Sequence, residues 1–178
     1  MRANLYEVGL SSDATATDSV QVNLWSAANL SSATPDYSVT AVLHTNGTLT
    51  AVFPGATLNN SYYVALKHRN SIETWSAEPV TIASTGSYDF STSLSSAYGD
   101  GFNEAMKSVS GGKYAIYAGD VNQDGTVDLY DSQITENGAI NTLFGYYSSD
   151  CNGDGSTDLF DLQLIENNST LSLFSARP

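Results

Sequence analysis

The chain is short of the residues on which many structural and catalytic sites depend. It has a single cysteine, Cys151, which excludes a framework of internal disulfides. It has six Lys and Arg residues against nineteen Asp and Glu, so it offers nucleic acid no basic patch to bind. It also has no run of about 18 apolar residues, which argues against a membrane-spanning helix. These absences leave an acidic chain outside the membrane, without a disulfide scaffold.

Histidine is equally scarce, and this bears on catalysis. The chain has two, His44 and His68, and we expect both on polar faces of strands, exposed to solvent. Two histidines do not complete a typical zinc site. There is no G-x-S-x-G motif, and the glutamates are too scattered to suggest the paired carboxylates of a glycoside hydrolase. The sequence therefore predicts a protein that is not an enzyme.

Acidic residues are concentrated at one end of the chain. Residues 119–178 carry −9 of the net charge of −13, and eight of the acids there lie in two twelve-residue passages, 120–131 and 150–161. Each passage has Gly at position 6 and oxygen-bearing side chains at the positions by which an EF-hand loop binds Ca²⁺, with position 7 contributing its backbone carbonyl. The predicted ligands of two Ca²⁺ ions are Asp120, Asn122, Asp124, Thr126, Asp128 and Asp131 in the first loop, and Asp150, Asn152, Asp154, Ser156, Asp158 and Asp161 in the second.

Repetition strengthens this prediction. A single Asp-rich and Gly-rich passage is also consistent with a solvated turn, but here every ligand position recurs thirty residues later. Position 12 is Asp in both loops where an EF-hand has Glu, and a shorter side chain still reaches the ion if the following helix starts closer to it. Because clustered carboxylates repel one another, we expect residues 119–178 to fold only with Ca²⁺. Cys151, at loop position 2, is expected to point away from the ion.

Neither loop follows a helix. A strand-like run, 113–118, precedes the first loop and a turn-like run, 145–149, precedes the second, so each unit consists of a loop and one helix. In this respect residues 119–169 resemble type I dockerin repeats, which are non-catalytic, calcium-folded modules of secreted bacterial proteins. Many dockerins bind cohesin domains, so the resemblance adds a cohesin to the candidate partners.

The sequence departs from the dockerin pattern at loop positions 10 and 11. These are commonly polar in dockerins that bind cohesins, but here they are apolar: Leu129, Tyr130, Leu159 and Phe160. Either a hydrophobic partner docks on them or they are buried against residues 1–118. We expect burial, because four large exposed apolar side chains are a liability in a soluble protein.

Residues 1–118 have the pattern of a β-protein. Alternating runs predict strands at 5–10, 20–24, 37–44, 48–53, 61–68, 73–77, 79–82 and 113–118, with an Asn46-Gly47 hairpin turn and a helical turn at 102–107. This favours a fold that is mainly β with a small α part: an antiparallel immunoglobulin-like sandwich over 1–118, followed by a dockerin-like module over 119–178. Helices are expected at 129–137, capped by Asn137-Gly138, and after 158. Because Gly119 alone separates strand and loop, we expect the two parts to pack together.

A second resemblance concerns the β part. The run 62–76, with Tyr88-Asp89-Phe90 and Ala97-Tyr98-Gly99, resembles sandwiches that precede dockerin-like repeats in surface and adhesin-like proteins of Bacteroidota-type bacteria. It implies a secreted, cell-surface location and the C-terminal part of a longer chain. The function expected is adhesion, anchoring or assembly through a protein partner or a neighbouring subunit or domain of a surface assembly. The alternatives are a true dockerin that tethers a carbohydrate-active enzyme to a cohesin scaffold, and a polysaccharide-binding sandwich that uses Trp25, Trp75 and some of the eleven tyrosines.

One further alternative remains open at the end of a predicted strand. The basic run Lys67-His68-Arg69 is either a solvated strand end or a contact to the acidic loops across the interface between the two parts.

Overall fold

The computed structural model describes residues 4–101 and 104–178. The described chain is mainly β, and its principal sheet is antiparallel: β1 (Ala16–Trp25), β2 (Tyr37–His44), β3 (Ser61–His68), β4 (Thr74–Trp75) and β5 (Val80–Thr81). The strand order is β2-β1-β3-β4, and β5 also pairs with β3. The strands predicted at 37–44 and 61–68 form with those bounds. A separate hairpin joins β6 (Lys107–Val109) to β7 (Lys113–Ala115).

Alternation along β1 and β3 buries both faces of this sheet. Val22 and Leu24 lie with Tyr62 and Val64 in a core on one face. Trp25, Ala65 and Trp75 form the core of the opposite face. Short 3₁₀ turns connect the strands at Ala27–Asn29, Gly55–Thr57, Phe90–Thr92 and Leu94–Ser96. The immunoglobulin-like topology of a full sandwich stays a prediction.

Two of the predicted strands are wrong. The first is a helical turn, α1 (Asn4–Glu7), which ends at Gly9 with φ of 77° and a bond from the Leu10 amide to the Leu5 carbonyl. That is a glycine C-terminal cap, a signal that the apolar alternation obscured. The second, 48–53, follows the predicted turn but forms no strand, because Leu49, Ala51 and Phe53 pack on the sheet face instead of pairing beside β2. Their alternation serves burial and not pairing.

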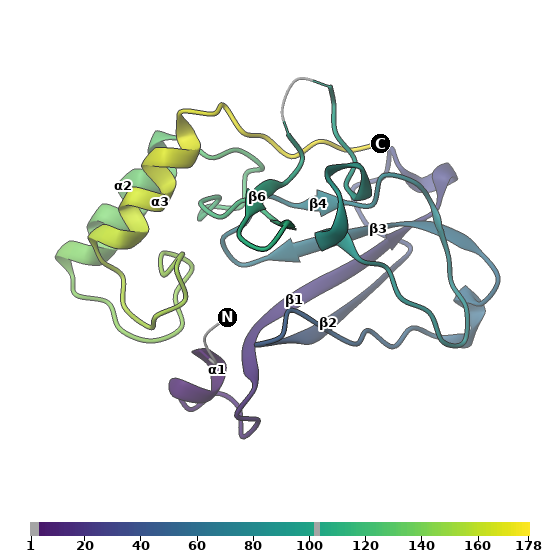
Figure 1. Cartoon of the computed structure of the whole chain (residues 1–178), viewed down its shortest axis with the longest axis horizontal. Coiled ribbons are helices and arrows are strands. Elements are labelled where there is room, and N and C mark those ends of the chain that lie inside the picture. Colours follow the sequence, from purple (N-terminus) through teal and green to yellow (C-terminus); the bar gives the residue numbers. More distant parts are fainter. Residues whose placement is uncertain (1–3, 102–103) are drawn as a thin grey trace.

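Two longer helices follow, α2 (Leu129–Ile140) and α3 (Leu159–Ser169), and they lie side by side at one end of the molecule, at the left of Figure 1. The predicted cap at Asn137-Gly138 is wrong, because α2 continues to Ile140. Part of the helical turn expected at 102–107 lies outside the described residues, and from Lys107 the chain is a strand. None of the helices in the described ranges is long and apolar enough to span a bilayer.

The two parts of the chain share a hydrophobic core. Ile72 and Tyr117 pack with Val121, Val127, Ile165 and Leu173, and the half-buried Cys151 lies against this cluster. Hydrogen bonds reinforce the junction: the Gly119 amide donates to the Asn70 carbonyl at 2.7 Å, and the Asn168 side-chain amide donates to the Ala118 carbonyl at 2.7 Å. The predicted packing of residues 119–178 against the β part is therefore present, whereas the boundary at 118 stays a prediction.

Candidate calcium loops

The helix starts fix one end of each loop. Asp128 at position 9 caps α2 by accepting a hydrogen bond from the Tyr130 amide at 2.8 Å, and Asp131 accepts from the Asp128 amide at 2.9 Å. Asp158 and Asp161 form the same reciprocal capping box on α3. The carboxylate of Asp131 also accepts the amides of Val121 and Asn122 at 2.7 and 3.1 Å. The position-12 aspartate therefore ties the start of its loop to the start of its helix.

The middle of each loop is a pair of side-chain turns. The Asn122 side chain accepts from the Asp124 amide at 2.9 Å, and Asp124 accepts from the amide and hydroxyl of Thr126 at 3.0 and 2.7 Å. The second loop repeats this through Asn152 and Asp154, whose contact with the Ser156 amide is 3.0 Å. Gly125 and Gly155 at position 6 adopt φ of 91° and 87°, as predicted for the sharp turn.

Positions 1 and 12 bury four carboxylates: Asp120, Asp131, Asp150 and Asp161 are each at most 2% exposed. Burial, followed by repulsion from Asp131, raises the pKa of Asp120 to about 6. Burial likewise raises the pKa of Asp131, Asp150 and Asp161. Buried carboxylates that repel one another favour a compensating cation.

The donor set of each loop fits calcium by its chemistry, because it consists of hard oxygen atoms. Asp120 Oδ1 is buried and has no hydrogen-bond partner, whereas Oδ2 accepts from the Gly125 amide at 3.2 Å. Within the part of the chain that the structure describes, however, no three Asp, Glu, His or Cys side chains already converge as a metal cluster. Several of the oxygens, including those of positions 9 and 12, instead accept backbone amides. The twelve predicted ligands therefore lie in two loops, and their coordination of Ca²⁺ stays a prediction.

The loops are related by an internal twofold repeat. The Val127 amide donates to the Leu173 carbonyl at 3.2 Å, and thirty residues along the chain the Thr157 amide donates to the Leu143 carbonyl at 2.9 Å. Each loop thus pairs with the segment that follows the other loop's helix. This exchange locks both loops and both helices into one unit.

The β part contacts the second loop through a charged network. This network bears on the two alternatives that the sequence left open for the basic run. Arg69 Nε lies 3.0 Å from Asp18 Oδ2, and its Nη2 lies 3.7 Å from Asp150 Oδ2. His68 Nε2 is 2.9 Å from Asp18 Oδ2, and the Tyr146 hydroxyl donates to Asp18 Oδ1. Of the run Lys67-His68-Arg69, Arg69 makes the contact to the acidic loops, at Asp150, whereas His68 contacts Asp18 of β1. The expectation that His68 is exposed is wrong, because its side chain is 13% exposed.

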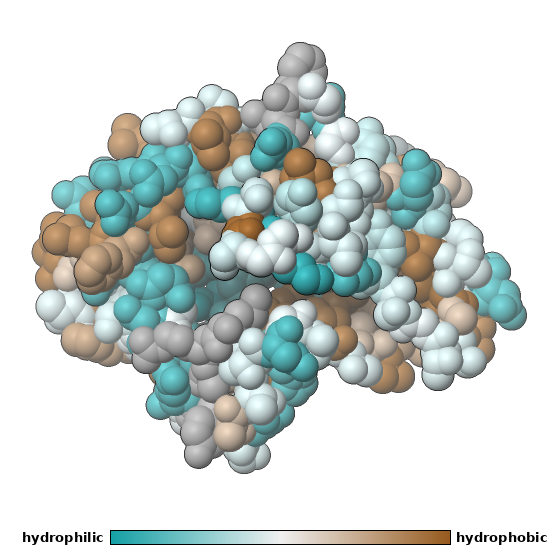
Figure 2. Space-filling model, in the orientation of Figure 1, coloured by the Kyte–Doolittle hydropathy of each residue, from teal (hydrophilic) through white to brown (hydrophobic). Residues whose placement is uncertain are grey.

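The predicted burial of loop positions 10 and 11 is wrong. Leu129, Tyr130, Leu159 and Phe160 are 80%, 68%, 75% and 69% exposed. Each occupies the first turn of its helix, where the buried Asp131 or Asp161 turns inward and these neighbours turn outward. Apolar side chains accordingly gather over α2 and α3, at the left of the molecule in Figure 2. We name these four residues the helix-start face.

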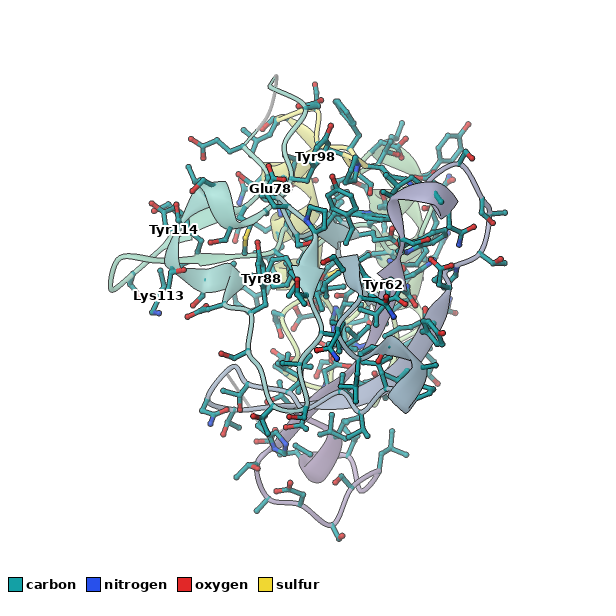
Figure 3. The ribbon with its side chains drawn as sticks, turned by 90° about the vertical axis from the view of Figure 1, so that its right-hand side faces the viewer. Tyr62, Glu78, Tyr88, Tyr98, Lys113 and Tyr114 are labelled. Carbon is teal, nitrogen blue, oxygen red and sulfur yellow. The ribbon has the colours of Figure 1, made fainter. Side chains whose placement is uncertain are left out.

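The two tryptophans expected in a polysaccharide-binding surface are not exposed. Trp25 and Trp75 are buried, with ring centroids 5.4 Å apart, and Arg177 lies 4.2 Å from the Trp25 ring. Figure 3, in which the right-hand side of Figure 1 faces the viewer, shows the labelled Tyr62, Tyr88, Tyr98 and Tyr114 scattered and not gathered in one place. A sugar-stacking platform built on the two tryptophans is therefore not available.

Comparison with known proteins adds little. No protein-family model matches this chain, and no curated protein matches it. Among solved structures, it is similar to a chain of a mutant type II cohesin–X–dockerin complex from Acetivibrio cellulolyticus, with 18% identity, 85% of this chain and 81% of that chain covered, and a TM-score of 0.46. Similarity at this level establishes neither a shared fold nor a shared function.

Sequence reasoning missed two residues at the second loop. Asn70 donates to the Asp150 carbonyl at 2.8 Å, and Asn4 donates to Asp150 Oδ2 at 3.2 Å. Both lie far from the loop in sequence, and a lone asparagine gives no pattern that would have found them.

Proposed function

We propose that residues 119–178 bind two Ca²⁺ ions and that the chain is a non-catalytic module of a secreted, cell-surface bacterial protein, acting in anchoring, adhesion or assembly. The observation that carries this is the ordered pair of loops, each burying two carboxylates beneath a capped helix. Ca²⁺ would neutralise these carboxylates and hold α2 and α3 rigid against the β part.

The helix-start face favours a protein partner for this module. Its four side chains occupy matched positions of the two repeats and are more than two-thirds exposed. Such exposed apolar groups are typical of interaction sites. This supports the alternative of a dockerin that binds a cohesin, with a hydrophobic contact in place of the common polar one. Polysaccharide binding is the weaker alternative, since the tryptophans are buried.

Calorimetric titration of the metal-free protein tests the calcium proposal. We expect two Ca²⁺ per chain, one after Asp124→Ala or Asp154→Ala, and none after both changes. Because each change removes a predicted oxygen ligand, it should lower the melting temperature only when Ca²⁺ is present. Asn46→Ala, in an exposed turn, is the control and should leave both sites intact. The proposal would be contradicted if Ca²⁺ produced no heat on titration and left the melting temperature unchanged.

A further inference from the structure

The two loops differ in what holds the aspartate at position 1. In the first loop, Asp120 Oδ2 accepts the Gly125 amide at 3.2 Å and Oδ1 has no partner. In the second, Asp150 Oδ2 accepts the equivalent Gly155 amide at 3.1 Å and also the Asn4 side-chain amide at 3.2 Å. The loops repeat in sequence, but among the described side chains of α1 a donor reaches only the second loop.

Asn4 is buried against the second loop. It is 1% exposed although it is polar, and its Oδ1 has no hydrogen-bond partner. A Cβ at Gly155 would lie 3.7 Å from Asn4 Oδ1 and 3.7 Å from Val8 Cγ1, so α1 and the residue that follows it cover position 6 of the loop. A buried amide that directs its donor at a carboxylate is costly to leave unpaired, which makes the contact specific.

The orientation of Asp150 shows what this contact does. Asp150 Oδ1 accepts the Gly153 and Asp154 amides at 2.8 and 3.1 Å, within the loop. Oδ2 accepts the Gly155 amide of the loop at 3.1 Å and, from outside the loop, the Asn4 side-chain amide at 3.2 Å, with Arg69 Nη2 3.7 Å away. The bond from Asn4 therefore adds a donor from outside the loop to those that fix the rotation of the carboxylate.

We infer that Asn4 is a positioning residue for the second calcium loop, so that Ca²⁺ binding at this loop and docking of α1 stabilise each other. The inference rests on the proposed calcium function. Groups that orient a metal ligand from outside typically change metal affinity by about 10-fold to 100-fold when they are removed. Coupling is reciprocal, so Ca²⁺ must in turn hold α1 in place.

Asn4→Asp tests this with an isosteric change that replaces the donor by a charged acceptor. Affinity is measured by calorimetry with Ca²⁺ alone, in an Asp124→Ala background that retains the second loop and an Asp154→Ala background that retains the first. We expect a loss of about 10-fold or more at the second loop, a smaller loss for Asn4→Ala, and no change at the first loop. Asn46→Asp, which adds the same charge in an exposed turn, is the matched control.

Other outcomes overturn the inference. Tighter Ca²⁺ binding by Asn4→Asp would show that residue 4 is a direct ligand. Equal losses of affinity at both loops would show that Asn4 acts only through general packing.

Amide hydrogen exchange of residues 4–8 gives a second measurement in the unmodified chain. Ca²⁺ should slow exchange there, should still do so in Asp124→Ala, and should not in Asp154→Ala; unchanged exchange would contradict the coupling. If wild type bound no Ca²⁺, the proposed function itself would fail, and wild type is therefore titrated first.

Discussion

At the scale of single residues, buried charge decides how the two parts of the chain meet. Asp18 on β1 is 4% exposed, yet it collects His68, Arg69 and the Tyr146 hydroxyl around one carboxylate. Arg69 also lies over the Tyr146 ring, 4.6 Å from its centroid, and donates to the Tyr147 carbonyl. Removing one partner of such a group leaves the others buried and unpaired, so the network ties β1 and β3 to the segment before the second loop.

Asp18→Asn should therefore change the pH dependence of stability. Burial opposes ionisation of Asp18, but His68, Arg69 and Tyr146 outweigh it and lower its pKa from 3.8 to about 2. A lowered folded-state pKa stabilises the fold above pH 4, and this contribution is lost as the pH falls through 2. Wild type should exceed the variant by about 2 kcal/mol in free energy of unfolding at pH 6. Urea denaturation at fixed Ca²⁺ measures the difference, which should shrink between about pH 4 and pH 2. A gap that did not depend on pH would show that the charge of Asp18 is irrelevant.

At the scale of elements, local sequence predicted more than it missed. Strong alternation placed β2 and β3, and the Asp-rich loops placed the starts of α2 and α3, because periodicity and capping are local properties. Segment 48–53 was missed because what its apolar residues pack against is decided by tertiary structure, whereas α1 was missed although its glycine cap at Gly9 is a local signal. The loops were likewise local, but Asn4 and Arg69 reach Asp150 from distant parts of the chain. No local pattern contains that information, nor the outward direction of Leu129 and Leu159.

Gly138 within α2 is required by the packing of the helix against the second loop and not by helix propensity. In an exposed helix interior, alanine is normally more favourable than glycine by about 1 kcal/mol. Here a Cβ would lie 2.8 Å from Thr157 Cγ2 and 3.1 Å from Ser149 Oγ, so α2 can approach the second loop closely only without a side chain. Gly138→Ala should lower the free energy of unfolding by about 1–3 kcal/mol. Asn137→Ala, at the adjacent exposed position, is the control for helix propensity and should be neutral or slightly stabilising. Urea denaturation distinguishes the two, and a stabilised Gly138→Ala would show that the contact yields without strain.

At the scale of the whole molecule, the chain returns to its own sheet. After α3, Phe174 bridges to Thr126 of the first loop, and Ser175 donates to the Glu73 carbonyl at 3.1 Å. Arg177 then lies over Trp25 and Trp75 and donates to the Ser32 carbonyl at 3.2 Å. The last residues, which run from α3 back to the sheet in Figure 1, thus link the first loop to the sheet. Asn4, Arg69 and Asn70 link the second loop to the rest of the chain. Both loops are anchored, and the helix-start face is left outside these anchors.

That arrangement predicts that the helix-start face can be changed without loss of stability. Leu129→Gln combined with Leu159→Gln alters two side chains that are 80% and 75% exposed, so the melting temperature in Ca²⁺ should fall by no more than about 2 °C. Binding to a panel of immobilised cohesin domains should be lost, because an apolar contact in both repeats is removed. Val52→Gln is the matched control: it is 78% exposed but lies on the β part, and it should keep both stability and binding. Unfolding of the double variant would mean that these leucines pack within the molecule, equal binding would place the contact elsewhere, and a wild type that bound none of the panel would exclude those cohesins as partners.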